Sequence, residues 1–230
     1  MSGSDVIVIG GSAGGMKALR GIFQTLDDIG PAVVWVVLHR APDHSPLAQV
    51  LQGYTTIPIQ EPGNSPWDCA PGTVMVAPAG YHLLVGASRS LAREPQSPIS
   101  LYENGTGVRA HLTLDAPVAY SRPSIDVTFS SAAELDNSVT AVLLSCANDD
   151  GAAGCEAVKA AGGRVVLQDP ATCEAAAAVN AAMRRVEPDL VADPRGIGSW
   201  LAHQIASKSN QSSTANRSPR ATRVAPPWPG

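Results

Sequence analysis

Apolar, β-branched runs alternate along this chain with amphipathic stretches, and this alternation limits the possible folds more than any other feature. Buried strands are predicted at 6–10, 32–39, 139–145 and 164–168. These runs are apolar almost throughout, as strands that are covered on both faces should be. Strands that alternate with helices form βαβ units around a mostly parallel sheet. The sequence therefore predicts an α/β fold with a mostly parallel, doubly wound sheet.

Helices are predicted between and after these strands. Their ranges are 16–26, 46–53, 124–135, 151–161, 172–185 and 198–206, and a weak last strand is predicted at 190–192. The middle of the chain differs, because proline and glycine separate its short apolar segments, 57–61, 72–77, 82–85 and 99–102. We expect these segments to form a β-hairpin or meander inserted at one edge of the sheet.

The end of the chain has a different composition from the rest. Residues 207–230 are rich in serine and proline and contain almost no aliphatic side chain. They hold four of the 16 basic residues and no acidic one, so the net charge of −4 becomes −8 without them. Such a segment buries too little apolar surface to order itself. We therefore expect one domain over 1–206 and a disordered basic tail over 207–230.

Length and composition argue against several classes of protein. With 230 residues, 44% of them hydrophobic, the chain can bury a large core without a disulfide or metal staple. No run of about 18 apolar residues is present, and the N-terminus lacks the features of a signal peptide. The small number of aromatic residues and the negative net charge argue against nucleic-acid binding. The cysteines form no C-x-x-C pair, the spacing that would indicate a metal site. We expect a cytoplasmic protein without membrane insertion, nucleic acid, metal or cofactor.

A glycine-rich turn at residues 10–15, GGSAGG, joins the first predicted strand to the first predicted helix. One use of such a turn is dinucleotide binding, in which the middle glycine of G-x-G-x-x-G lets a pyrophosphate approach the backbone. Here Ser12 takes that place, and no acidic residue ends the second strand. Another use is the nucleophile elbow G-x-S-x-G, which residues 10–14 match. On this motif alone, a catalytic serine, a nucleotide loop and a turn without chemistry remain open.

Two more polar segments follow predicted strands. His39 ends the second strand, and Asp149 and Asp150 follow the strand at 139–145. Because the carboxyl ends of parallel strands meet at one edge, we expect these side chains near Ser12. His39 could act as general base and an aspartate could orient it, although either aspartate could instead cap a helix. The chain order Ser, His, Asp disfavours an ordinary α/β-hydrolase, whose order is Ser, Asp, His.

In order and spacing, these segments resemble the catalytic domain of the chemotaxis receptor methylesterase CheB over roughly residues 5–205. The segments that carry the resemblance are 9–15 (IGGSAGG), 38–40 (LHR), 122–127 (RPSIDV) and 148–154 (NDDGAAG), with 70–72, 76–78 and 161–169 in support. The resemblance implies a three-layer α/β/α sandwich that hydrolyses glutamyl methyl esters on receptors to glutamate and methanol. It also implies deamidation of particular receptor glutamines.

The resemblance also assigns roles to residues. It implies that Ser12 is the nucleophile, His39 the base and Asp150, rather than Asp149, the acid of a catalytic triad. Backbone amides near Ala13 and Ala147 would stabilise the oxyanion. The implied partner is the set of cytoplasmic helices of a methylated chemotaxis receptor.

This sequence departs from the family in two segments. Residues 146–148 are Cys-Ala-Asn where the family has a glycine-rich loop, and residues 174–182, EAAAAVNAA, lack its usual Met-Pro pair. These departures motivate an alternative, a catalytically weakened CheB-like binding or scaffold module. The resemblance also implies that full-length members of the family carry an N-terminal receiver domain. Because this chain begins at the first strand of the catalytic domain, we expect it to have no receiver domain.

Other candidate residues have plainer interpretations. His82 lies in a segment that matches one beside the family's active site, and we interpret it as a core or rim histidine. Cys146, Cys155 and Cys173 lie among small residues, which favours packing over metal binding.

Overall fold

The computed structural model describes residues 5–41, 45–63, 65–87, 107–135 and 138–215. Its main sheet has seven strands in the order β10-β9-β8-β1-β2-β5-β3, and every pairing within it is parallel. The strands are β1 (Val6–Gly11), β2 (Val33–Leu38), β3 (Ile59–Gln60), β5 (Thr73–Val76), β8 (Val139–Leu143), β9 (Arg164–Gln168) and β10 (Leu190–Ala192). The predicted doubly wound α/β sheet is confirmed.

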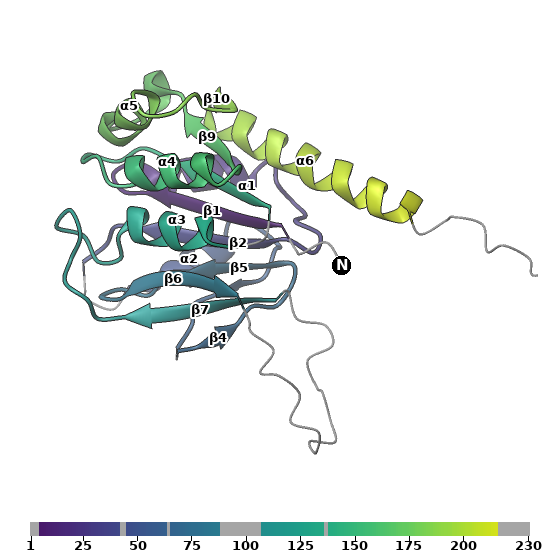
Figure 1. Ribbon diagram of the computed structural model, residues 1–230, viewed down its shortest axis with the longest axis horizontal. Coiled ribbons are helices and arrows are strands. Elements are labelled where there is room, and N and C mark those ends of the chain that lie inside the picture. Colours follow the sequence, from purple (N-terminus) through teal and green to yellow (C-terminus); the bar gives the residue numbers. More distant parts are fainter. Residues whose placement is uncertain (1–4, 42–44, 64, 88–106, 136–137, 216–230) are drawn as a thin grey trace, which may run out of the picture.

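Helices cover both faces of this sheet, which gives three layers (Figure 1). They are α1 (Gly15–Phe23), α2 (Leu47–Gln52), α3 (Ile125–Ala133), α4 (Ala152–Ala160), α5 (Ala177–Met183) and α6 (Pro194–Ala215), with a 3-10 turn at Pro170–Thr172. Buried residues of α3, α4 and α5 form one core, and those of α1, α2 and α6 form the other. Along β1, Val6 and Val8 face the first core whereas Ile7 and Ile9 face the second. This two-sided burial explains why the strand is apolar throughout.

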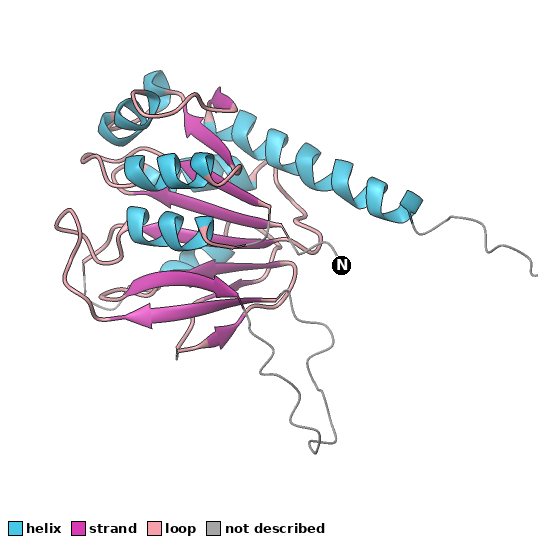
Figure 2. Cartoon of the chain, viewed as in Figure 1, coloured by secondary structure: helices cyan, strands magenta, loops and turns pink. Residues whose placement is uncertain are grey.

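A separate antiparallel sheet lies beside the main one, in the order β4-β7-β6 (Figure 2). Its strands are β4 (Trp67–Asp68), β6 (His82–Ala87) and β7 (Val108–Thr113). This is the predicted β-rich insertion, although the strand expected at 99–102 lies outside the described residues. The insertion is smaller than predicted, because β3 and β5 belong to the main sheet. All four residues of β5 are buried, so it forms another covered strand next to β2.

The helix predicted at 172–185 is wrong over its first five residues, because α5 begins only at Ala177. Residues 173–176, just before it, are not helical, and a parallel bridge joins Ala176 to Cys146. The amide of Cys146 donates to the carbonyl of Ala175, and the amide of Ala178 donates to the carbonyl of Cys146. These tertiary hydrogen bonds override the high helix propensity of the alanine run.

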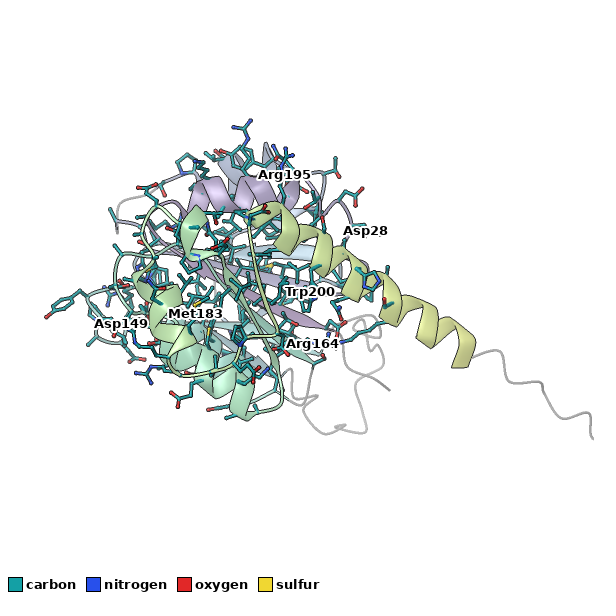
Figure 3. All side chains as sticks on the ribbon, turned by 90° about the horizontal axis from the view of Figure 1, so that it is seen from above. Asp28, Asp149, Arg164, Met183, Arg195 and Trp200 are labelled. Carbon is teal, nitrogen blue, oxygen red and sulfur yellow. The ribbon has the colours of Figure 1, made fainter. Side chains whose placement is uncertain are left out.

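The last helix, α6, continues well beyond residue 206. Residues 207–215, where we expected a disordered tail to begin, are helical, and 216–230 lie outside the described residues. The ammonium of Lys208 donates to Asp5 at 2.6 Å and to Ser138 at 2.8 Å, which ties the extension to the domain. Earlier along α6, Trp200 packs against Arg164, whose guanidinium lies 6.0 Å from the ring centroid (Figure 3). In the described part of the chain, none of the helices has both the length and the apolar character needed to cross a bilayer.

Candidate active site

The carboxyl ends of the central strands β1, β2 and β8 lie together, on the left in Figure 1. The amide of His39 donates to the carbonyl of Gly11 at 3.1 Å, directly after the paired residues of β1 and β2. The amide of Ser12 donates to the carbonyl of Ser145 at 2.9 Å, which ties it to the loop after β8. The predicted meeting of these segments at one edge is therefore confirmed.

The glycines around Ser12 are required by close packing and by backbone conformation. At Gly10, a Cβ atom would lie 2.3 Å from the side chain of Ile125, because α3 packs directly on β1. Gly14 has a φ of 78°, in the left-handed region, where it caps the start of α1. Ser12 thus precedes a helix N-terminus, whose dipole favours negative charge. Within the described residues, its hydroxyl has no hydrogen-bond partner.

Asp150 is fully buried and accepts four hydrogen bonds at the N-terminus of α3. Its Oδ1 accepts from the hydroxyl of Ser124 and the amide of Asp126, both at 2.9 Å. Its Oδ2 accepts from the amide of Ile125 at 2.8 Å and from Nε2 of His39 at 2.7 Å. Burial works to raise the pKa of Asp150, but these hydrogen bonds, led by that from His39, hold the pKa below its ordinary value. Asp150 is therefore a carboxylate.

A second carboxylate makes the reciprocal contact with α4. Oδ1 of Asp126 accepts from the amides of Gly151 at 2.9 Å and Gly154 at 2.6 Å. Burial and the charge of Asp150 raise the pKa of Asp126 above its ordinary value, against the effect of these amides. Helices α3 and α4 thus each hold the aspartate of the other segment, and their packing fixes the position of Asp150.

His39 lies between two sets of partners. Its Nε2 faces Asp150, while its Nδ1 lies 3.2 Å from the hydroxyl of Ser121 and 3.9 Å from the sulfur of Cys146. Burial works to lower the pKa of His39, but the hydrogen bond to Asp150 and the contact with Cys146 raise it from 6.5 to about 9. At neutral pH, His39 is therefore charged and forms a part-buried ion pair with Asp150.

The structure thus pairs two of the predicted triad residues and places the third beside them. His39 and Asp150 are hydrogen-bonded, and Ser12 follows the neighbouring strand without a hydrogen bond to His39 among the described residues. The backbone amides of Ala13 and Ala147 have no acceptor in the part of the chain that the structure describes. Asp149 is exposed at this edge (Figure 3) and is not a partner of His39.

The interpretation of His82 as a core histidine is confirmed. Its ring is 1% exposed, its Nδ1 accepts from the amide of Ser124 at 3.2 Å, and its Nε2 donates to the carbonyl of Ala116 at 3.1 Å. Cys146 and Cys155 are also fully buried, as predicted, whereas Cys173 is only partly buried.

Sequence reasoning gave no role to Ser121, Ser124 or Asn148. Ser124 is the N-cap of α3 as well as a donor to Asp150. A serine directly after a proline and before an amphipathic run is a usable signal for such a cap. Ser121 and Asn148 carry no comparable signal, because their contacts depend on loops distant in sequence.

The two segments that depart from the family pack against each other beside the site. The amide of Cys146 donates to the carbonyl of Ala175 at 3.0 Å. The hydroxyl of the preceding Ser145 accepts from the amide of Ala175 at 2.9 Å and donates to its carbonyl at 3.1 Å. A cavity of about 440 Å³ opens next to His39, and its lining residues are His39, Arg40, Ala41, Gly80, Pro117, Tyr120, Ser121 and Arg122. The described residues contain no group of three or more histidine, cysteine or acidic side chains that could hold a metal ion.

Comparison with known proteins identifies the family of this chain. The model of the CheB methylesterase family matches residues 7–201. This chain belongs to the CheB methylesterase family. A similar fold is seen in the crystal structure of the Thermotoga maritima CheB methylesterase catalytic domain, with a TM-score of 0.73 and 27% identity. That alignment covers 89% of this chain and all of the Thermotoga chain.

Curated members of the CheB family are also similar in sequence. A putative protein-glutamate methylesterase/protein-glutamine glutaminase of Leptospira interrogans (strain Fiocruz L1-130) is 32% identical over 189 residues, which cover 81% of this chain and 88% of the relative. A protein-glutamate methylesterase/protein-glutamine glutaminase of Paraburkholderia xenovorans is 33% identical over 175 residues. In that case the match covers 75% of this chain and only 43% of the longer relative.

Proposed function

We propose that this chain is a serine carboxylesterase that hydrolyses glutamyl methyl esters on proteins, with Ser12 as nucleophile, His39 as base and Asp150 as the orienting acid. Its substrate is a methylated chemotaxis-type receptor, whose cytoplasmic helices it meets in the cytoplasm, and the same site deamidates glutamines. The observation that carries the proposal is the buried His39–Asp150 pair directly beside the Ser12 turn. The names of similar proteins support the choice of substrate.

Acylation follows from the positions of the polar groups. The oxygen of Ser12 attacks the ester carbonyl and its proton passes to Nδ1 of His39. Meanwhile, the Nε2–H group of His39 keeps its hydrogen bond to the carboxylate of Asp150. The negative oxygen that develops on the substrate meets the free amide of Ala13, at the positive end of α1, and the free amide of Ala147, in the loop after β8. The carbon–oxygen bond to the methoxy group then breaks, and the proton on His39 leaves with it as methanol.

Deacylation repeats these steps with water. His39 takes a proton from a water molecule, whose oxygen attacks the ester formed by Ser12. The bond to Ser12 breaks, its oxygen regains a proton from His39, and the glutamate side chain is released as a carboxylic acid. Asp150 stays ionised throughout, because its low pKa keeps it a carboxylate that stabilises the charged imidazole.

The test is methanol release from a methylated receptor by the wild-type protein and by Ser12→Ala. We expect Ser12→Ala to release no methanol above background, because no other group replaces its oxygen as nucleophile. The matched control is Ser130→Ala, which alters an exposed serine on α3 away from the site and should keep full activity. Turnover retained in folded Ser12→Ala would contradict the mechanism.

A second candidate function, a receptor-binding module without productive turnover, is favoured by two observations. The hydroxyl of Ser12 has no hydrogen bond to His39 among the described residues, and Ser121 occupies the nitrogen that would act as base. This candidate predicts receptor binding without methanol release and no labelling of Ser12 by a fluorophosphonate. Stoichiometric labelling of Ser12 would exclude it.

A further inference from the structure

The nitrogen of His39 that must accept the Ser12 proton already has a partner. Asp150 takes Nε2, so Nδ1 is the nitrogen left for catalysis. In the structure, Nδ1 lies 3.2 Å from the hydroxyl of Ser121 and 3.9 Å from the sulfur of Cys146. The resting site therefore pairs its base with a serine that lies outside the proposed triad.

The surroundings of Ser121 suit the protonated form of His39. The hydroxyl oxygen of Ser121 lies 3.4 Å from the carbonyl of Ala119, so it can donate to this carbonyl while it accepts from Nδ1–H. The same carbonyl accepts from the side-chain amide of Asn148 at 3.2 Å. The thiol of Cys146 donates in turn to the oxygen of Asn148 at 2.9 Å. When both ring nitrogens carry a proton, each proton has an acceptor, Asp150 on one side and Ser121 on the other.

The turn that carries Ser121 is held in an unfavourable conformation. Val118 and Ser121 exchange two backbone hydrogen bonds, of 3.1 and 2.8 Å. Between them, Ala119 has a φ of 48° and Tyr120 a φ of 64°, a left-handed pair that residues other than glycine rarely adopt. Such strain persists only where the surroundings impose it, and it gathers at functional sites. Here it directs Ser121 toward His39 and Ala119 toward Asn148.

We propose that Ser121 is a positioning residue of the esterase: its hydroxyl, presented by the strained 118–121 turn, accepts the Nδ1 proton of His39 and holds the free enzyme in the charged, inactive form of its base. This inference rests on the proposed function. His39 must lose this proton to water before it can take the one from Ser12. Ser121 therefore adds to the effect of Asp150 and Cys146 and raises the pH at which the free enzyme becomes competent.

Several charged or titratable groups surround His39. They are Asp150 and Cys146 from the segment after β8, Arg122 next to Ser121, Arg40 next to His39 itself, and Asp126 behind Asp150. Arg40 is directed away, since its guanidinium donates to Glu61 and to the carbonyl of Ala77. Ser121 is uncharged, so its replacement by alanine removes a hydrogen bond and leaves all these charges in place. A changed pH profile would therefore report the hydrogen bond itself.

The experiment follows the rate of Ser12 labelling by a fluorophosphonate between pH 6 and 10. A hydrogen bond to a charged group is about twice as strong as a neutral one, so losing the Ser121 hydroxyl disfavours charged His39. Ser121→Ala should therefore move the midpoint of the profile of labelling rate against pH about 0.5 to 1 pH unit lower. Labelling at pH 7 should then be about 3- to 10-fold faster than in the wild type. Ser121→Thr keeps the hydroxyl and should restore the wild-type profile, whereas Ser130→Ala should not change it. An unmoved or raised midpoint in Ser121→Ala would overturn the proposal.

A second readout separates this proposal from the proposed function. The titration of the His39 ring by ¹⁵N NMR, in protein that carries Ser12→Ala, requires no turnover. Adding Ser121→Ala should lower its midpoint by the same amount, and Asn148→Ala, which loosens the turn, should lower it less. If the wild type neither labels nor releases methanol, the proposed function fails while this titration still decides the role of Ser121. A His39 midpoint insensitive to Ser121→Ala contradicts that role.

Discussion

The two sides of the catalytic edge differ in how completely their polar groups are paired. On the acid side, Asp150 is fully buried and every one of its hydrogen bonds comes from α3 or His39. On the nucleophile side, the hydroxyl of Ser12 and the amides of Ala13 and Ala147 have no partner among the described residues. The acid side is therefore part of the fold, whereas the nucleophile side keeps free the groups that the proposed mechanism assigns to the substrate.

This difference follows from what each side must do. A buried carboxylate is tolerated only when hydrogen-bond donors replace the water it has lost, so the residues around Asp150 must supply these donors in the folded protein. Groups that stabilise a transition state act best when they are fixed in place and unoccupied until the substrate arrives. Changes on the acid side should therefore affect both stability and activity, and changes on the nucleophile side should affect activity alone.

The largest expected effect is that of Asp150→Ala. It leaves the donors of His39, Ser124 and the α3 amides without an acceptor, so the free energy of unfolding should fall by about 3–5 kcal/mol. Methanol release should fall by about 10⁴-fold, because His39 loses both its orientation and its counter-charge. Urea denaturation and receptor demethylation assays measure the two effects.

Ser12→Ala is the matched change on the open side. Its free energy of unfolding should stay within about 0.5 kcal/mol of the wild type, because no hydrogen bond of its side chain is lost. If Ser12→Ala destabilised the protein as much as Asp150→Ala, the contrast between the two sides would be wrong.

The next effect is a dependence on pH that has opposite signs for activity and stability. Activity needs neutral His39, so kcat/KM should rise about 100-fold between pH 7 and 10, with a midpoint near the pKa of about 9. The raised pKa means that charged His39 stabilises the fold fully below pH 6.5 and loses this effect as the pH rises through about 9. The free energy of unfolding, compared between wild type and His39→Gln over this range, measures the second effect. If the profile of kcat/KM against pH had its midpoint near pH 6.5, Asp150 would not stabilise the charged form of His39.

The smallest expected effect is that of Ser124→Ala. It removes one of four hydrogen bonds to Asp150 and the N-cap of α3, so the free energy of unfolding should fall by about 1–3 kcal/mol. Because the contacts of Asp150 with His39 and two amides remain, activity should fall only about 10-fold. Ser130→Ala, on the same helix, serves as the control. An activity loss as large as that of Asp150→Ala would show that Ser124 has a more direct role.

Much of the fold could be predicted because burial on two faces leaves a visible pattern. The strand at 164–168 and the last strand at 190–192 agree with the structure at both ends. The errors lie where tertiary contacts override local preference. The alanine run is not helical before Ala177 because Cys146 takes part of its backbone hydrogen bonding, and β7 was missed because no local signal marks it.

Strand order predicted the edge at which Ser12, His39 and an aspartate meet. The choice of Asp150 over Asp149 came from the resemblance to the CheB family, and the hydrogen bond from His39 to Asp150 agrees with it. The partner of the other nitrogen of His39 could not be predicted, because Ser121 reaches it from a turn 82 residues further along the chain. The roles of Ser124 and Asp126 were missed for a similar reason. They depend on α3 and α4 packing side by side, which no periodicity in the sequence indicates.

The course of α6 has a practical consequence. Its last turns extend from the side of the domain opposite the catalytic edge (Figure 1), and Lys208 fastens them to Asp5, just ahead of β1. A surface, a dye or a carrier protein attached near Ala215 would therefore leave Ser12 and His39 facing solution. Immobilised protein could then be exposed to receptor-bearing membranes with its catalytic edge outward.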